Sequence, residues 1–314
     1  MKRPDRSLVS ITLLRRLAFA NIVANAAIVV TGGAVRLTAS GLGCPTWPRC
    51  TDESYTATAE MGMHGAIEFG NRLLTFVLVL IAGATLLAVL AYRPRRRGVV
   101  PLALAVVLGI VAQAVIGGIT VRTQLHPSIV GIHFVVSMLL LLVAYALWRR
   151  VSEPDGRKVP VVPPALRSLT WITVAASAAV IVVGVAVTGS GPHAGDADAV
   201  RNGLDPQTVS QIHADLVFLL VGLTVGLWLA LRAVGAPARA ALTLLLVELG
   251  QGLIGFVQYF TNLPALLVGL HMLGSCLVWL ATLAVLWSTH ERHPTQLPQP
   301  PTPAPTRTPA RSSR

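Results

Sequence analysis

The feature that most constrains this chain is an internal repeat in its apolar segments. Residues 113–148 align without a gap on residues 251–286. The identical pairs include Gln113 with Gln251, Ile116 with Ile254, Gly117 with Gly255, Thr123 with Thr261, Val130 with Val268, Gly131 with Gly269, His133 with His271 and Ser137 with Ser275. Self-similarity of this kind indicates one structural unit used twice. The repeated His stands near the start of a long apolar segment in each copy, which makes it the first candidate for chemistry.

The composition indicates that the repeated unit lies in a membrane. Of the 314 residues, 54% are hydrophobic and 12% are charged, and the mean hydropathy is +0.68. A soluble chain of this length needs more charge to cover its surface, so we predict an all-α polytopic membrane protein built as two pseudo-symmetric four-helix bundles. A spanning helix needs roughly 20 apolar residues. Eight such runs are predicted, near residues 17–36, 67–91, 99–121, 128–148, 168–188, 211–231, 240–260 and 264–287.

The charged residues predict the orientation. Most of the 25 Lys and Arg residues lie in the N-terminus, in the loops near residues 95, 155 and 235, and in the tail. Because Lys and Arg are retained on the cytoplasmic side of a membrane, we predict a multi-pass protein of the cell membrane with both termini in the cytoplasm. The net charge of +12 is distributed among loops rather than gathered with aromatic residues on a soluble domain, so a nucleic-acid partner is not expected.

These observations predict the organisation of the chain. The expected parts are a cytoplasmic N-terminus at 1–16, an N-terminal four-helix half at 17–150 with an outer loop at 37–66, a cytoplasmic linker at 151–167, a C-terminal four-helix half at 168–289 and a cytoplasmic tail at 290–314. The tail is rich in Pro, Thr, Arg and Ser from Pro294, which predicts disorder. The repeat extends more weakly to the first two helices of each half, where Asn71 falls on His213.

The C-terminal half carries a complete pair of candidate haem ligands. His213 and His271 open the second and fourth predicted helices of that half. Histidine at membrane depth usually faces a bundle interior and binds something, and two His on facing helices can supply both axial ligands of a haem iron. We therefore predict a haem between them, near the outer surface. The alternative for either residue alone is a hydrogen bond to a neighbouring helix.

The N-terminal half carries a different set of candidate ligands at the positions that align with His213 and His271. His133 is retained, but Asn71 stands where the other half has His213, and Asn is a poor haem ligand. His64 lies seven residues before Asn71, on the same helical face and nearer the outside. It is either a substitute ligand or a solvated loop residue. We therefore expect the C-terminal pocket to bind its haem permanently. The N-terminal pocket is expected to bind more loosely, which suits a substrate.

Two further groups stand near this pocket. Glu68 and Arg72 are four residues apart, a spacing that allows an ion pair on one helix; the carboxylate acts as a proton acceptor or a stabilising charge, or the pair is only structural. Cys44 and Cys50 share an outer loop in an oxidising compartment, which favours a disulfide. The alternative for the cysteines is a redox-active pair.

Several short motifs of this chain resemble the haem A synthase family. They are G-x-G-C-P-x-W-P-x-C in the first outer loop, I-E-F-x-N-R at the start of the second helix, and H-F, Q-I-H-A-D and L-H-M at the other helix openings. The resemblance covers about residues 10–290. Family members commonly have His three residues after the helix-two glutamate, where this chain has Asn71.

The resemblance implies a function for each half. The C-terminal half would hold haem b through His213 and His271, and the N-terminal half would receive haem O and oxidise its C8 methyl group to the formyl group of haem A. His133 would position the substrate iron, and Glu68 with Arg72 would manage protons or charge. The expected partners are haem O, haem O synthase, cytochrome c oxidase assembly and membrane lipid; the oxygen source, the electron partner and homo-oligomer formation are left open.

Two other classes of protein compete with this interpretation. A quinol-oxidising cytochrome with bis-histidine haems predicts two equivalent pockets, and Asn71 argues against it. A solute transporter predicts broken helices and polar sites at the membrane midplane, whereas this chain has its polar groups at the outer helix ends.

Overall fold

The structure, a computed structural model, describes residues 9–93, 96 and 98–293. Eight helices are long and apolar enough to cross a membrane, which confirms the predicted all-α polytopic class. Their bounds are α1 Ile11–Leu37, α2 Gly62–Ala91, α3 Val99–Arg122, α4 Pro127–Ser152, α5 Pro164–Ser190, α6 Pro206–Ala233, α7 Arg239–Phe260 and α8 Ala265–Ser288. A single 3-10 turn, Ala59–Met61, precedes α2, and the two short strands are β1 Lys158–Pro160 and β2 His290–Arg292.

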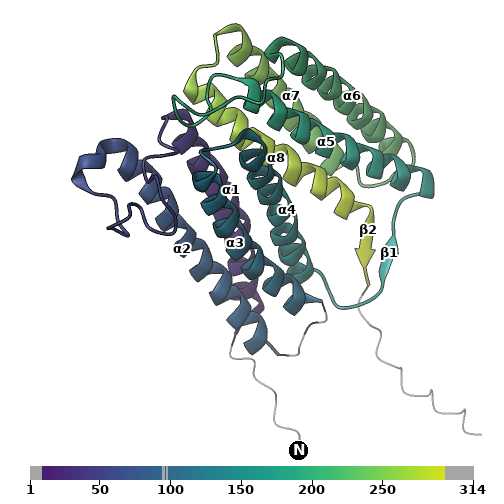
Figure 1. Cartoon of the computed structure of the whole chain (residues 1–314). Helices are drawn as coiled ribbons and strands as arrows, with labels where there is room; N and C mark the ends of the chain where they lie inside the picture. The colour runs from purple at the N-terminus through teal and green to yellow at the C-terminus, as the bar shows by residue number, and fades with distance from the viewer. Residues whose placement is uncertain (1–8, 94–95, 97, 294–314) are drawn as a thin grey trace, which may run out of the picture.

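Each half is a four-helix bundle in which consecutive helices are neighbours (Figure 1). In the first half α1 also packs on α4, and in the second half α5 packs on α8, so each set of four helices closes into a ring. Within the described chain, α2 makes no backbone contact with α4, nor α6 with α8. The second and fourth helices of each half, which carry the ligand-type residues, therefore face each other diagonally across the bundle.

The two halves pack through equivalent surfaces. Helix α1 packs on α8, its counterpart α5 packs on α4, and α4 meets α8 between them. The repeated glycines lie in this interface: Gly131 of α4 faces Val185 of α5, and Gly269 of α8 faces Leu37 of α1. A Cβ atom on Gly131 would lie 2.7 Å from the Val185 side chain. Small residues allow the close helix approach by which membrane helices associate.

The turns between paired helices repeat in detail. Gln124 and Leu125 join α3 to α4 with φ angles of 51° and 58°, and Asn262 and Leu263 join α7 to α8 with φ angles of 60° and 57°. In both turns the second of these residues donates its amide hydrogen to a carbonyl in the preceding helix at 2.8 Å. Left-handed backbone is uncommon outside glycine, so its occurrence at matched positions supports the duplication independently of the sequence identities.

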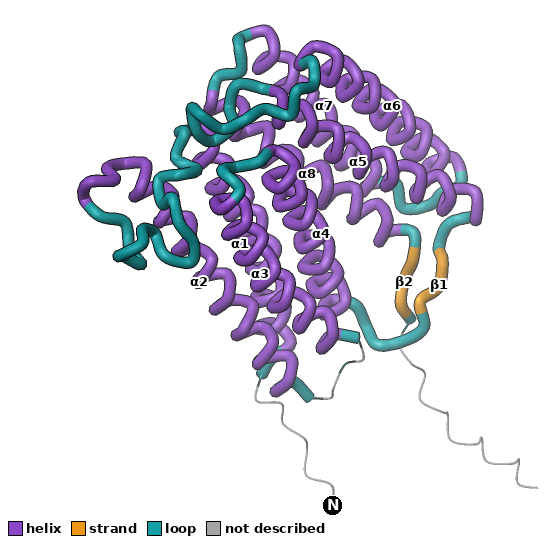
Figure 2. Tube along the Cα trace, in the orientation of Figure 1, coloured by secondary structure: helices purple, strands orange, loops and turns teal. Residues whose placement is uncertain are grey.

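The loops define two ends of the molecule (Figures 1 and 2). We call the end that carries the long loops after α1 and α5 the outer end, and the end that carries β1 and β2 the inner end. The antiparallel pairing of Lys158–Pro160 with His290–Arg292 was not predicted. The disordered tail was expected to begin at residue 290, but the Pro-rich composition that indicates disorder begins only at Pro294. Residues 294–314, like residues 1–8, lie outside the described part of the chain.

Polar contacts within the apolar core fix the helices against one another. The indole nitrogen of Trp279 on α8 donates to the Met138 carbonyl of α4 at 3.0 Å, across the interface of the two halves. Trp279 is 5% exposed. Within the halves, Asn21 of α1 donates to Thr85 of α2 at 2.7 Å.

Replacing Trp279 with Phe should weaken the contact between the halves. The variant retains most of the ring packing but loses one interhelical hydrogen bond, which is worth about 0.5–1.5 kcal/mol in a membrane protein. Thermal unfolding in detergent should show a lower midpoint. Trp171→Phe is the matched control, because Trp171 is 58% exposed on the outside of α5; an equal loss in both variants would contradict the assignment.

Candidate functional site

His213 and His271 face each other inside the C-terminal bundle. Helix α6 places His213 and helix α8 places His271 near the outer end, with their ring centroids 6.4 Å apart and their planes inclined at 66°. A metal–imidazole bond is about 2 Å long, so two rings on opposite sides of one iron have centroids about 6 Å apart. The separation of the two rings fits an iron between them.

The buried nitrogens of three His side chains also fit this interpretation. The Nδ1 atoms of His133, His213 and His271 are buried and have no hydrogen-bond partner among the described residues. Leaving a buried polar atom unsatisfied costs about 1–3 kcal/mol, so such atoms indicate a missing ligand or another function. The described residues contain no group of three or more His, Cys, Asp or Glu able to hold a bare metal ion. The donor set suits a prosthetic group that needs only one or two protein ligands.

Each ligand-type residue lies against a glycine of the preceding helix. A Cβ atom on Gly117, Gly184 or Gly255 would lie 3.0–3.4 Å from the ring of His133, His213 or His271 respectively. A Cβ atom on Gly32 would lie 4.0 Å from the side-chain amide nitrogen of Asn71. A larger residue would push the ring toward the bundle interior, so these glycines make room for the imidazoles.

Two repeated glutamines hold the helices that carry His133 and His271. The Gln113 amide donates to the His133 carbonyl at 3.1 Å, and the Gln251 amide donates to the His271 carbonyl at 2.8 Å. Gln113 also donates to Ser137 at 2.6 Å. These bonds link α3 to α4 and α7 to α8 at the level of the ligands, so they fix the depth and rotation of each His.

The N-terminal bundle does not bring its candidate ligands together as a facing pair. Asn71 on α2 accepts a hydrogen bond from the Thr31 hydroxyl of α1 at 2.8 Å, while His133 projects from α4 on the opposite side of the bundle. His64 is exposed in the first turn of α2, and its Nδ1 atom lies 2.9 Å from the Ser40 hydroxyl. The structure thus brings His213 and His271 together as a pair, whereas it gives His133 no facing imidazole at the Asn71 position.

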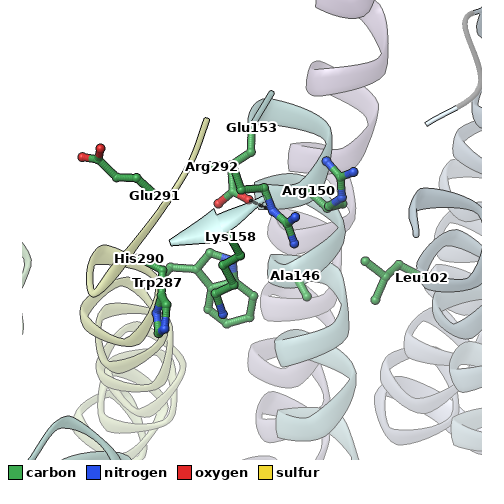
Figure 3. Close-up of a pocket in the computed structure, with 9 residues that line it drawn as sticks. All are labelled: Leu102, Ala146, Arg150, Glu153, Lys158, Trp287, His290, Glu291 and Arg292. Atoms are coloured by element: carbon green, nitrogen blue, oxygen red, sulfur yellow. Dashed lines mark hydrogen bonds and ion pairs between the residues drawn. The ribbon is translucent and has the colours of Figure 1, made fainter. Parts of the chain in front are cut away.

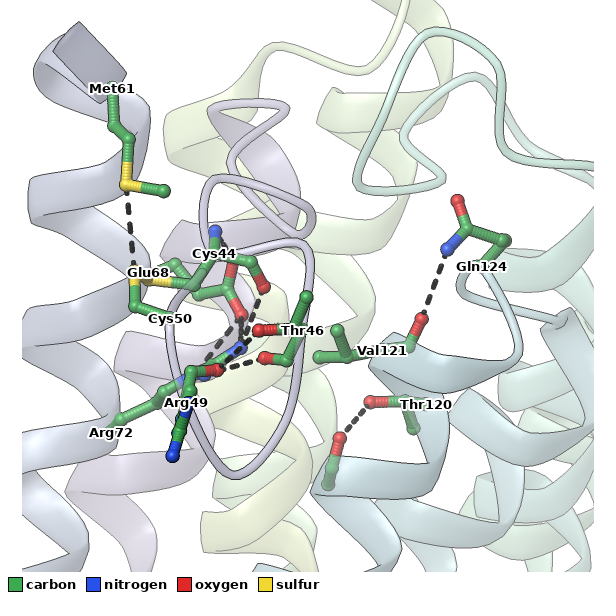
Figure 4. Close-up of polar contacts among 11 residues, drawn as sticks. Cys44, Thr46, Arg49, Cys50, Met61, Glu68, Arg72, Thr120, Val121 and Gln124 are labelled. Carbon is green, nitrogen blue, oxygen red and sulfur yellow. Dashed lines mark hydrogen bonds and ion pairs between the residues drawn. A yellow bond between two sulfur atoms is a disulfide. The ribbon is translucent and has the colours of Figure 1, made fainter. Parts of the chain in front are cut away.

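The outer loop before α2 is held by Glu68 and Arg72 (Figure 4). Cys44 and Cys50 form a disulfide. The Glu68 carboxylate accepts from the Cys44 backbone N–H at 2.6 Å and from Arg72 at 2.6 Å. Arg72 also donates to three loop carbonyls, those of Cys44, Thr46 and Arg49, at 2.8–3.1 Å. The ion pair expected from the spacing is present, and it docks the disulfide loop onto α2.

The same loop also covers part of the N-terminal bundle. The indole of Trp47, between the two cysteines, packs so closely on Gly118 of α3 that any side chain at that position would collide with it. On the other side of the loop, Gly43 packs on the backbone of His64. The loop therefore bridges the outer ends of α2 and α3 beside Glu68, which is 5% exposed.

Comparison with known families identifies the chain. A family model described as cytochrome oxidase assembly protein matches residues 15–198, more than half of the sequence. The chain belongs to this family. The match begins in the second turn of α1 and ends in the loop after α5, so it includes nearly all of the N-terminal bundle and the disulfide loop.

Relatives of this family member are named heme A synthase. The protein of Geobacillus kaustophilus (strain HTA426) is 35% identical over 123 residues, which cover 38% of this chain and 37% of the relative. The protein of Geobacillus thermodenitrificans is 31% identical over 140 residues, which cover 42% and 43%, and that of Listeria welshimeri is 30% identical over 132 residues, which cover 41% and 43%. The matched segment spans less than half the length of these relatives. The predicted family is confirmed.

Sequence reasoning missed the residues that support the ligands. The roles of Gln113 and Gln251 and of the glycines beside the rings were not assigned, although these residues are among the repeat identities. Thr31 carries no sequence signal. The carboxylate of Glu248 on α7 accepts a hydrogen bond from the Thr224 hydroxyl of α6 at 2.9 Å.

Replacing Arg72 with Ala should loosen the disulfide loop. The variant loses charge-assisted bonds worth about 1.5–3 kcal/mol each. A loss of about 1.4 kcal/mol of docking free energy would speed reduction of the disulfide by an added thiol about tenfold. The rate can be followed by maleimide labelling of Cys44 and Cys50. Arg122→Ala, which removes an exposed Arg at the end of α3, should leave the rate unchanged; equal rates in all three proteins would disprove the docking role.

Proposed function

We propose that this protein is a haem A synthase, which oxidises the C8 methyl group of haem O to the formyl group of haem A. The observation that carries the proposal is the pairing of His213 with His271 at a separation that fits one iron, beside a second bundle that retains only His133. The relatives named heme A synthase support it. A cytochrome with two equivalent haems fits this asymmetry less well.

In this proposal the C-terminal bundle holds haem b. His213 and His271 would hold it, and the hydrogen bond that Gln251 donates to the His271 carbonyl would fix the depth of His271 in the bundle. When bound, haem b supplies one-electron transfer between the substrate pocket and an external partner. Both imidazoles project from separate, well-packed helices, so the protein holds them at a fixed distance with little freedom to rearrange.

The N-terminal bundle receives haem O as the substrate. His133 positions the substrate iron, and His64 supplies a second nitrogen in place of the residue missing at Asn71. The His64 bond to Ser40 engages Nδ1, so Nε2 is the nitrogen assigned to the iron. Conversion of the methyl group to the aldehyde proceeds through an alcohol and a gem-diol that loses water, and it removes four electrons in total; an external oxidant, either dioxygen or an electron acceptor with water as the oxygen donor, must take up these electrons. Buried Glu68 and half-buried Arg72 form an ion pair on α2, and in this proposal they manage protons or charge beside the pocket.

The proposal also fixes the setting of the reaction. Among the described residues, most Lys and Arg side chains lie at the inner end, so we assign this end to the cytoplasm and the outer end to the opposite face of the cell membrane. Both haem pockets then lie in the outer half of the membrane. Haem O synthase supplies the substrate, and cytochrome c oxidase assembly uses the product.

Replacing His271 with Ala should abolish binding of haem b. Removing one axial ligand also leaves His213 without its partner, so the haem content of the purified protein should fall to near zero, as measured by the pyridine haemochrome spectrum. His126→Ala is the matched control, since His126 is exposed in the α3–α4 turn. Full haem content in the His271 variant would remove this residue from the ligand set.

Production of this protein together with a haem O synthase tests the activity itself. Haem extraction and chromatography should then yield haem A or its hydroxylated intermediate. If only haem B and haem O are recovered while His213 and His271 still hold a haem, the electron-transfer cytochrome becomes the better account.

The role of His64 can be tested by moving its imidazole. His64→Ala should weaken haem O binding by at least about tenfold, a loss seen even for residues that only support a metal ligand. Adding Asn71→His to this variant should restore binding, because it creates the ligand pair of the C-terminal half. Binding can be measured by titration of haem O and followed in the Soret band. Unchanged affinity in His64→Ala would assign His64 to the loop alone.

A further inference from the structure

A cavity of about 140 Å³ opens at the inner end of the interface between the halves (Figure 3). One wall comes from the N-terminal half and the other from α8 and the two strands. The lining residues are Leu102, Ala146, Arg150, Glu153, Lys158, Trp287, His290, Glu291 and Arg292. The cavity lies at the opposite end of the molecule from the haem pockets, so neither of those sites accounts for it.

Positive charge exceeds negative charge around this cavity. The Glu153 carboxylate pairs with both Arg149 and Arg292, at 3.3 and 3.1 Å. Asp155 pairs with both Arg96 and Arg150. Each carboxylate thus meets two guanidinium groups, and the cluster keeps a net positive charge after all these ion pairs have formed. An anion is the ligand that such a cluster favours.

Two more cations act on the same cavity. Burial and the charges of Lys158 and Arg167 lower the pKa of His290, which lines the cavity. The Lys158 ammonium makes no hydrogen bond or ion pair with the described residues, and the Arg167 Nε atom is buried without a partner. Figure 3 shows the Glu291 carboxylate pointing away from the other lining residues. Lys158, which lines the cavity, can therefore meet a bound anion directly, whereas Arg167 lies outside the lining and contributes its positive charge.

Aromatic residues place the cavity at the membrane surface. Tyr145 contacts Trp287 and Trp148, with ring centroids 5.3 and 5.6 Å apart, and Phe19 lies next to Trp148 at 5.9 Å. Trp and Tyr gather at the level of the lipid headgroups. Because Leu102 and Ala146 give the cavity an apolar wall, its occupant needs an apolar part as well as an anionic one.

We propose that this cavity binds the headgroup of an anionic phospholipid, with the phosphodiester between Lys158 and Arg150, the positive charge of Arg167 nearby, and an acyl chain along the Leu102 side. Basic pockets between membrane helices at the cytoplasmic surface are known to suit anionic headgroups. A free phosphate ion would match the cations but leave the apolar wall without a partner. The bound lipid would contact both halves and so hold them together at the inner end.

The test measures thermal unfolding of the delipidated protein in detergent, with phosphatidylglycerol, phosphatidylcholine or inorganic phosphate added. Phosphatidylglycerol should raise the midpoint more than the other two additives. In the double variant that carries both Lys158→Ala and Arg167→Ala, phosphatidylglycerol should raise the midpoint no more than the other additives do, because each lost charge weakens headgroup binding about fivefold. Arg239→Ala is the matched control, since it removes an exposed Arg at the inner end of α7 and should respond like the unmodified chain.

Native mass spectrometry provides a second measurement that does not depend on stability. The unmodified protein and the charge-preserving variant Lys158→Arg with Arg167→Lys should retain phosphatidylglycerol, whereas the double Ala variant should lose it. Equal effects of both lipids, an equal effect of inorganic phosphate, or retention of the lipid by the double Ala variant would each overturn the proposal. Haem content is measured separately, so this test can fail while the proposed haem A synthase activity stands.

Discussion

The structure depends on the need to place imidazole groups inside a membrane bundle. A buried nitrogen without a partner is costly where no water can reach it, yet three His side chains keep a buried Nδ1 atom unpaired within the described chain. Other features follow from this requirement. The second and fourth helices lie diagonally across each bundle, glycines next to the rings make room for them, and Gln113 and Gln251 hold the backbone at their level.

The duplication explains both the likeness and the difference of the two pockets. A repeated unit supplies the same frame twice, and the matched left-handed turns show how closely the frame has been retained. Only the residue at one corner changes the chemistry. The His213 ring faces the His271 ring, whereas Asn71 accepts a hydrogen bond from the Thr31 hydroxyl of the neighbouring helix. Under the proposed function, a pocket with one fixed imidazole releases its occupant more readily than a pocket with two, as a substrate site requires.

The sequence predicts local features better than long-range ones. Hydropathy predicts all eight helices, because a membrane span is specified by its own residues. The repeat identified His133 and His271, and residue type identified His213. The spacing predicts the ion pair of Glu68 with Arg72, but it does not predict the Cys44 partner, since the amide of Cys44 reaches the carboxylate only through the path of the loop. The pairing of β1 with β2 joins segments more than a hundred residues apart, and neither has a strand-like pattern of its own.

The two bundles are joined at both ends of their interface. At the outer end Arg36 of α1 donates to the carbonyls of Thr188 and His193, and His193 in turn contacts the Leu263 carbonyl at 2.9 Å. At the inner end β2 pairs with β1, and Arg292 reaches Glu153. Between these ends the interface consists of close helix contacts and the Trp279 bond. An interface fastened at both ends holds the two bundles at a constant distance more securely than apolar packing alone, because lipid tails compete for apolar surfaces but not for these polar contacts. Under the proposed function, electron transfer between the two haem sites depends on that constant distance.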